Sequence, residues 1–320
     1  MIGSILRGVI ALLLFYGTPQ VFAQTIPNRG DNSDRADAPA ASGSAVPANA
    51  AIQDSAPSQN STQQTAADTG FWHHWFERVT KTQAQQPHWI TPLATTTPRL
   101  EEEFRSDIAW QEANNGIYAE NYSLSKGLEL IPSEHVELIL SVPPYIVHNQ
   151  PNVADGFGDP SFLVKYRLLS ANEEHGNYIL TAFLAATLPT GQDHVGMLAA
   201  TITPTIAAGK GWGNFDVQTT VGVSFPVSDT NIIGRSVIWN TAFQYRVVRK
   251  LWPELEVNST FFLDGPHSGM KQTFLTPGLV VGRFHLWQRL GVTIGTGVQI
   301  AVTQFHTNNH SWILSLRFPF

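Results

Sequence analysis

The chain has 320 residues, no cysteine, a net charge of -6 and only 14% charged side chains. The missing cysteines exclude disulfide scaffolds, thiol nucleophiles, iron–sulfur clusters and zinc sites built on cysteine. The acidic balance gives no electrostatic support for a nucleic-acid partner. A mean hydropathy of -0.08 indicates that apolar and polar residues are finely interleaved instead of separated into long blocks.

The start of the chain, residues 1–23, is typical of a secretory signal peptide. Arg7 supplies the positive charge, residues 9–16 form a short apolar run, and Val21 to Ala23 fit a small-x-small cleavage pattern. The alternative is a transmembrane anchor, which needs about 20 apolar residues, more than this run provides. We therefore predict that the chain is exported and cleaved after Ala23.

Two unlike segments separate this leader from the rest of the chain. Residues 24–70 contain no aromatic residue and are rich in Ala, Ser, Asn, Gln and Pro, which predicts a disordered tether. Residues 71–97 open with the cluster Phe-Trp-His-His-Trp-Phe and continue as a Thr-, Gln- and Pro-rich linker. The cluster fits a metal site, an interfacial anchor or a short plug. Adjacent histidines point in different directions, so we favour the anchor or the plug and expect no metal.

Residues 98–320 alternate apolar and polar residues with period two, which predicts β-strands. In residues 213–227, for example, Phe215, Val221 and Phe225 share one face while Asp216 and Gln218 share the other. We count twelve such segments: 99–110, 117–131, 134–147, 160–170, 177–189, 197–209, 213–227, 235–249, 253–264, 271–284, 287–303 and 308–320.

These runs are longer than the mean globular strand of about 5–6 residues. In hydrocarbon every backbone N–H and C=O needs a partner within the protein, so a membrane-spanning sheet must close on itself. The sequence therefore predicts an all-β fold, a closed antiparallel transmembrane β-barrel of about 12 strands, placed in the outer membrane. Ten or fourteen strands are the alternatives, because the second, sixth and tenth segments alternate less cleanly. Pro204 and Pro277 each predict a bulge or a local break, since proline lacks the N–H that a ladder needs.

The last strand ends in an apolar alternation that resembles the C-terminal assembly signal of bacterial outer-membrane proteins. Its members are Trp312, Leu314, Leu316, Phe318 and Phe320. The expected partners are therefore the barrel-assembly machinery, through this strand, and outer-membrane lipid.

An even strand number places both ends of the barrel sequence in the periplasm. Trp212, Trp252 and Trp287 then fall at periplasmic turns, where we predict an aromatic girdle at the membrane interface.

Three stretches carry a family resemblance: Gly-Phe-Gly-Asp-Pro at 156–160 leading into Phe-Leu-Val-Lys-Tyr-Arg-Leu at 162–168, Leu-Pro-Thr-Gly at 188–191, and residues 209–218. Together they resemble the outer-membrane barrels assigned to transport in the phenol-degradation meta-pathway. The resemblance covers about residues 99–320, and Lys165 and Tyr166 match a Lys-Tyr pair of that family. It implies transport of small hydrophobic or aromatic compounds.

The alternation also predicts which charged residues line the lumen. They are Glu101, Glu103, Arg105, Asp107, Lys165, Arg167, Asp216, Arg246, Glu254, Glu256, Arg289 and Arg317. Two interpretations stay open: charges that pair across a filled, structural interior, or a charged constriction that selects solutes.

We predict an outer-membrane channel or transporter, with a small-molecule solute as its cargo and no cofactor. The alternative is a barrel with a filled lumen that anchors a periplasmic partner. A lipid-hydrolase activity is the least favoured reading, because no serine and histidine are spaced to form a catalytic dyad.

Overall fold

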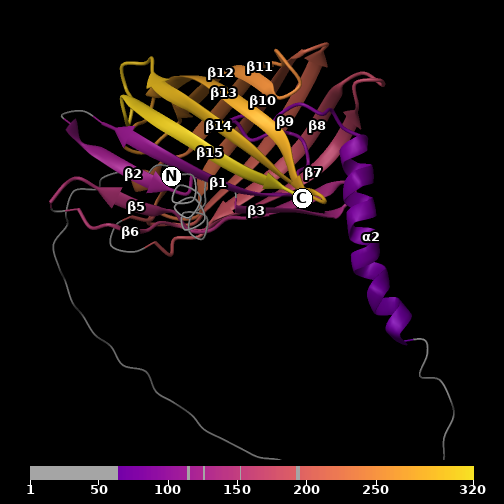
Figure 1. Cartoon of the computed structure of the whole chain (residues 1–320). Helices are drawn as coiled ribbons and strands as arrows, with labels where there is room; N and C mark the ends of the chain where they lie inside the picture. Colours follow the sequence, from indigo (N-terminus) through magenta and orange to yellow (C-terminus); the bar gives the residue numbers. More distant parts are fainter. Residues whose placement is uncertain (1–63, 114–115, 125–126, 152, 192–194) are drawn as a thin grey trace, which may run out of the picture. The chain divides into compact units, whose positions relative to one another are not determined.

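The protein, a computed structural model, is described for residues 64–113, 116–124, 127–151, 153–191 and 195–320. The predicted signal peptide and residues 24–63 of the predicted tether lie outside the described residues. The remaining chain is dominated by strands, which form one antiparallel sheet (Figure 1).

The strands follow one another in chain order. They are β1 (Glu103–Glu112), β2 (Tyr118–Tyr122), β3 (Gly127–Ser133), β4 (Val136–Leu140), β5 (Tyr145–His148), β6 (Gly156–Phe157), β7 (Ser161–Ala171), β8 (Tyr178–Thr187), β9 (Thr201–Trp212), β10 (Phe215–Pro226), β11 (Ser236–Tyr245), β12 (Leu251–Phe262), β13 (Lys271–Trp287), β14 (Leu290–Ala301) and β15 (His310–Pro319).

Pairing between β1 and β15 closes the sheet into a barrel. Their register runs from Glu103 opposite Pro319 to Glu112 opposite His310, and Figure 1 shows the two strands side by side. Three walls are interrupted, so β2 with β3, β4 with β5, and β6 with β7 each follow one path across the barrel. The prediction of a closed antiparallel barrel with twelve strands is confirmed.

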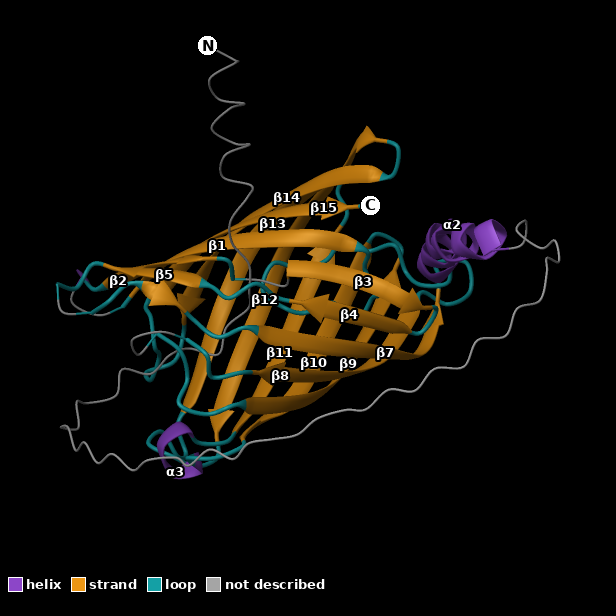
Figure 2. Cartoon of the chain, turned by 90° about the horizontal axis from the view of Figure 1, so that it is seen from below, coloured by secondary structure: helices purple, strands orange, loops and turns teal. Residues whose placement is uncertain are grey.

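The barrel has two unlike ends. The turn rim carries the short connections 134–135, 172–177, 213–214, 246–250 and 288–289, together with the start of β1 and the end of β15. The loop rim carries the longer connections, which include the short helix α3 (Thr230–Ile233) between β10 and β11. Figure 2 shows α3 at this rim, at the far end of the barrel from the C-terminus.

Some predicted strand ends need correction. The first strand begins at Glu103 and not at residue 99, because residues 99–102 bond to a segment inside the barrel. The ladder between β9 and β10 is interrupted beside Pro204, and the ladder between β13 and β14 is interrupted beside Pro277. Both prolines therefore break the ladder locally on one side, as predicted, without changing its register.

The barrel reverses the polarity of a soluble protein. In β10, Asp216, Gln218 and Thr220 are buried on the inner face, whereas Val221 and Phe225 are exposed on the outer face. The same exposed apolar character covers the outer face of the other long strands. A continuous apolar exterior of this kind needs lipid around it.

The long helix α2 (Gln64–Ala84) precedes the barrel and contains the whole aromatic–histidine cluster. It begins inside the segment predicted as tether, so the boundary predicted at residue 70 is not a boundary of the structure. Among the described residues, neither helix combines the length and apolar character that a bilayer crossing requires.

The outer face predicts a depth-dependent response to charge. We expect Ile294→Arg, in the middle of β14, to lower the free energy of unfolding in lipid vesicles by about 2–4 kcal/mol, because the new charge enters hydrocarbon. The matched variant Val302→Arg, just beyond the end of β14, should cost only about 0–1 kcal/mol near the interface. Denaturant titration in vesicles measures both, and equal costs would contradict a membrane-embedded outer face.

Candidate functional site

A stretch of chain between α2 and β1 runs inside the barrel. We call residues 85–102 the luminal segment. Leu93 is 2% exposed, and its backbone N–H donates to Glu254 Oε1 on β12 at 3.0 Å. The hydroxyl of Thr97 donates to Gln218 Oε1 on β10 at 2.8 Å. Since β1 begins and α2 is anchored at the turn rim, the segment enters and leaves by the same end, as a re-entrant loop (Figure 1).

Two arginines on the inner wall bind the carbonyls at the tip of this loop. Arg105 on β1 donates to the carbonyl oxygens of Pro92 and Leu93. Arg317 on β15 donates to the carbonyl oxygens of Thr91 and, at 2.8 Å, Pro92. The fork of donors on a guanidinium suits this task, because it can serve two neighbouring acceptors at once.

Two glutamates on β12 bind the backbone N–H groups of the same tip. Glu254 accepts from Leu93, and Glu256 accepts from Ala94 at 2.7 Å and from Thr95 at 2.5 Å. The wall thus satisfies both the donors and the acceptors of a backbone that forms no sheet ladder. A buried irregular segment needs such partners, because an unpaired backbone group away from water is costly.

The neck of the loop is closed by a reciprocal pair. Gln86 Nε2 donates to the Leu100 carbonyl at 2.7 Å, and the Leu100 N–H donates to Gln86 Oε1 at 3.0 Å. Beside it, Lys165 Nζ donates to the Arg99 carbonyl at 3.0 Å and forms a fully buried ion pair with Glu137 at 2.9 Å. The two strands of the loop are therefore held together where they enter the barrel.

Shape as well as polarity fits the segment to the wall. Leu93 lies in a notch formed by Gly278, Gly295 and Gly297, where a Cβ would approach its methyl groups to 2.5–2.8 Å. Leu93 also forms a small apolar cluster with Trp252 and Val280. These inner-face glycines leave the room that the leucine occupies, so larger side chains at their positions would displace it.

The C-terminal end of α2 is fastened to the turn rim. Arg167 on β7 donates to the Thr82 carbonyl at 2.9 Å and to Gln85 Oε1 at 3.1 Å. Lys81 pairs with Glu134 of the β3–β4 turn at 2.7 Å. A cation at the end of a helix satisfies carbonyls that lack partners within the helix and complements its dipole.

A second contact fixes the chain just after α2. Glu173, in the β7–β8 turn, accepts from the backbone N–H of His88 at 2.7 Å and lies 2.8 Å from the His88 ring. Partial burial alone would raise the pKa of Glu173, but these two hydrogen bonds prevail and hold that pKa below its ordinary value. The carboxylate therefore stays charged at the point where the luminal segment begins.

The interior charges do not bridge an open lumen. Arg105 pairs with Asp107 of its own strand at 2.6 Å, and Arg99 of the luminal segment pairs with Glu101 at 2.8 Å. We predicted pairing across the interior, but the luminal segment occupies that space. The wall charges contact its backbone and one another at short range.

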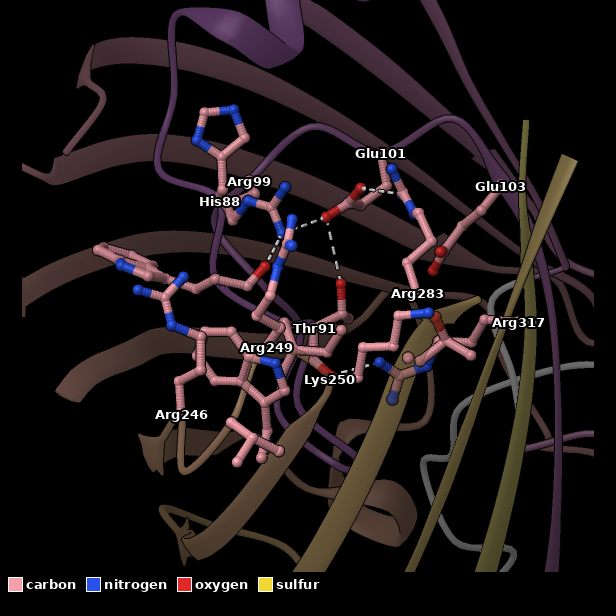
Figure 3. Close-up of a pocket in the computed structure, with 16 residues that line it drawn as sticks. His88, Thr91, Arg99, Glu101, Glu103, Arg246, Arg249, Lys250, Arg283 and Arg317 are labelled. Carbon is pink, nitrogen blue, oxygen red and sulfur yellow. Dashed lines mark hydrogen bonds and ion pairs between the residues drawn. The ribbon is translucent and has the colours of Figure 1, made fainter. Parts of the chain in front are cut away.

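Two cavities lie within the barrel (Figure 3 shows the first). The larger, about 840 Å³, opens near the turn rim and is lined by side chains that include His88, Arg99 and Lys250. The smaller, about 190 Å³, is lined by hydroxyl and apolar side chains that include Thr96 and Phe183. Residues of the luminal segment line both cavities, and its tip at Leu93–Thr96 lies between the lining residues His88–Thr91 and Thr96.

Most of the predicted lumen residues are buried in the interior. These are Glu101, Glu103, Arg105, Asp107, Lys165, Arg167, Asp216, Glu254, Glu256 and Arg317. Arg246 lies just beyond β11 and lines the larger cavity. The placement of Arg289 was wrong: it is exposed in the β13–β14 turn, where it donates to Thr80 Oγ1 on α2 at 3.0 Å. The alternation that placed it inward ends where β14 begins, at Leu290.

The three tryptophans predicted as a girdle divide into two groups. Trp212 and Trp287 are exposed at the turn rim, 57% and 68% respectively. Trp252 is only 5% exposed and packs inside the barrel against Leu93, so its placement on the lipid side was wrong. Trp252 shares the inner face of β12 with Glu254, a relation that the alternation itself could have shown.

The predicted assembly-signal residues lie on one face of β15 and at its end. Trp312 is exposed, and Leu314, Leu316, Phe318 and Phe320 are half-buried, while Ser311, Ser315 and Arg317 between them face inward. Recognition by the assembly machinery stays a prediction.

Sequence reasoning missed most of the residues that hold the loop. Gln218 donates to Gln244 Oε1 at 2.8 Å and to the Ile90 carbonyl at 3.0 Å, and Gln244 donates to Glu254 Oε2 at 2.6 Å. The strand alternation places both glutamines inside, but no local signal reveals that a segment from another part of the chain binds them. Across the described residues, no group of three or more histidines and carboxylates is arranged to hold a metal.

No protein-family model matches the sequence, and no curated protein matches it. Among solved structures, the chain is similar to an outer-membrane channel from Pseudomonas putida F1, with 14% identity, a TM-score of 0.43, and coverage of 68% of this chain and 94% of the other. It is also similar to the NanC porin, with 8% identity, a TM-score of 0.46, and coverage of 67% and 98%. OmpF of Salmonella typhi gives 9% identity, a TM-score of 0.34, and coverage of 68% and 96%.

Glu256 tests how firmly the wall holds the luminal segment. In a Thr95→Cys background the single thiol is buried, so a maleimide labels it only when the segment leaves its place. Glu256→Gln replaces one acceptor oxygen by an N–H, which removes about 1–3 kcal/mol of holding energy. We therefore expect labelling about tenfold to a hundredfold faster.

The matched control is Glu174→Gln in the same background, because Glu174 is exposed in the β7–β8 turn. It should leave the labelling rate unchanged. Equal rates for the Glu256 and Glu174 variants would show that the β12 carboxylates do not retain the segment.

Proposed function

We propose that this protein is an outer-membrane channel whose lumen is closed by its own luminal segment. The observation that carries the proposal is the way the segment is held. Its tip is bound by hydrogen bonds from the wall and by one small apolar cluster, with no ladder to any strand. Such contacts can be exchanged for water, so the segment can leave and return without unfolding the barrel.

The interior supports a path on both sides of the closure. One cavity lies between the luminal segment and the turn rim, and another is lined by the tip residue Thr96 and by inner-face threonines such as Thr203 and Thr220. A barrel made only to be stable would fill these spaces with side chains, since interiors pack closely. Removal of the segment would join the two cavities.

The apolar exterior and the closed ladder support placement in a membrane, with the turn rim toward the periplasm. The solute class that we propose, small apolar or aromatic compounds, draws on the resemblance of residues 99–320 to meta-pathway transporters. Leu93, Trp89 and Trp252 support it from the interior, because they add apolar surface to a polar lumen.

The filled lumen also favours a second function. A barrel that keeps the luminal segment permanently in place would serve as a membrane anchor, with the chain before α2 free to hold a periplasmic partner. The two functions differ in one measurable property, because only the channel conducts when the segment is released.

A disulfide between the segment and the wall separates the two functions. The side chains of Thr95 and Asn258 are in contact, with 3.4 Å between Thr95 Oγ1 and Asn258 Nδ2, and the chain has no other thiol. We expect the double variant Thr95→Cys with Asn258→Cys to be silent in planar bilayers when it is oxidised or bridged by a short thiosulfonate reagent. Reduction should restore the openings of the unmodified protein.

Each single-cysteine variant is the control, because oxidation should leave its conductance unchanged. Openings that persist in the bridged protein would show that the segment does not block the path. A folded barrel that never conducts, bridged or reduced, would reject the channel and favour the anchor.

A further inference from the structure

The cavity near the turn rim has the size of a small-molecule site. Its volume of about 840 Å³ lies within the range of about 300–1,000 Å³ that is usual for ligand pockets. Its walls come from the luminal segment, from the turn 246–250, and from the inner faces of β1, β14 and β15. Because Glu103, Thr293 and Arg317 are buried on those inner faces, the cavity reaches into the barrel and admits a small molecule better than a protein surface.

Its lining is strongly basic, as Figure 3 shows. The cationic side chains are Arg99, Arg246, Arg249, Lys250, Arg283 and Arg317, whereas the carboxylates are Glu101 and Glu103. Glu101 pairs with Arg99 at 2.8 Å and lies 3.8 Å from Arg283. The carboxylates therefore balance only part of the positive charge.

The surplus charge is concentrated in one turn. Arg246, Arg249 and Lys250 belong to the connection between β11 and β12, and none of them has a carboxylate partner among the described residues. The N–H of Gly282 donates to the Lys250 carbonyl at 2.9 Å, which brings Arg283 next to this turn. Like charges held close together repel one another, and a bound anion would offset that repulsion.

Apolar surface lies directly beside these cations. The guanidinium of Arg246 is 5.6 Å from the centre of the Trp252 ring. Trp89, Ile90 and Val248 line the same cavity. A ligand with a charged end and a flat apolar body matches this combination better than an inorganic ion, which would use only the cations.

We propose that this cavity, the basic vestibule, binds small organic anions. The carboxylate of the ligand is held by Arg249, Lys250 and Arg283, and its apolar body lies against Trp89 and Trp252. The inference narrows the solute class of the proposed channel and rests on that function for the route by which the ligand arrives.

Benzoate and its neutral isostere benzamide test the site without any need for conduction. Calorimetric titration of the full chain in detergent should show benzoate binding at least about tenfold more tightly than benzamide, because only the carboxylate gains charge-assisted hydrogen bonds. Raising the salt to about 1 M should weaken benzoate binding, since screening then acts within about 3 Å. Equal affinities, or no benzoate binding, would overturn the proposal.

A pair of matched variants locates the site. Arg249→Ala with Lys250→Ala should weaken benzoate about tenfold or more while leaving benzamide unchanged. Arg235→Ala with Lys271→Ala removes the same charge at the loop rim and should leave benzoate binding as it was. Equal losses in both would assign the effect to net charge and reject the vestibule. If the double variant fails to form a heat-resistant barrel, Arg249→Gln alone provides the same comparison.

The outcomes also separate the vestibule from the channel. A barrel that conducts but binds benzoate and benzamide alike rejects the vestibule and keeps the channel. A barrel that binds benzoate selectively but never conducts keeps the vestibule and rejects the channel.

Discussion

The structure depends on one constraint, that a backbone removed from water must find its hydrogen-bond partners within the protein. The barrel wall meets it by closing the ladder between β1 and β15, which leaves no unpaired edge. The luminal segment meets it differently, because it has no neighbouring strand. Arg105, Arg317 and Glu256 take the place of that strand, and so charged side chains are needed where a soluble protein would have an apolar core.

The same constraint explains why so many charges are buried. A charge in the interior is costly unless it is paired and hydrogen-bonded, and removing one partner leaves the other exposed to that cost. Lys165 meets both needs at once, since it pairs with Glu137 and donates to the Arg99 carbonyl. The interior is therefore specific for this segment in one position, although its apolar contacts are few.

The sequence predicts the wall far better than the content of the lumen. Alternation with period two is a local signal that repeats in every strand, and residues such as Asp216 and Glu254 follow it directly. Trp252 obeys the same alternation but was assigned by its residue type and its nearness to a turn, which misled us. Thr95 and Glu256 are 161 residues apart in the chain, and no periodicity marks the luminal segment, so their contact had no local signal.

The re-entrant path of the luminal segment sets how quickly an opened barrel can close again. The segment is attached to α2 at one end and to β1 at the other, and both attachments lie at the turn rim. After release, its tip therefore stays beside the mouth at an effective concentration on the order of millimolar, as for a short linker. Closing is then an intramolecular step whose rate does not depend on how many copies of the protein the membrane contains.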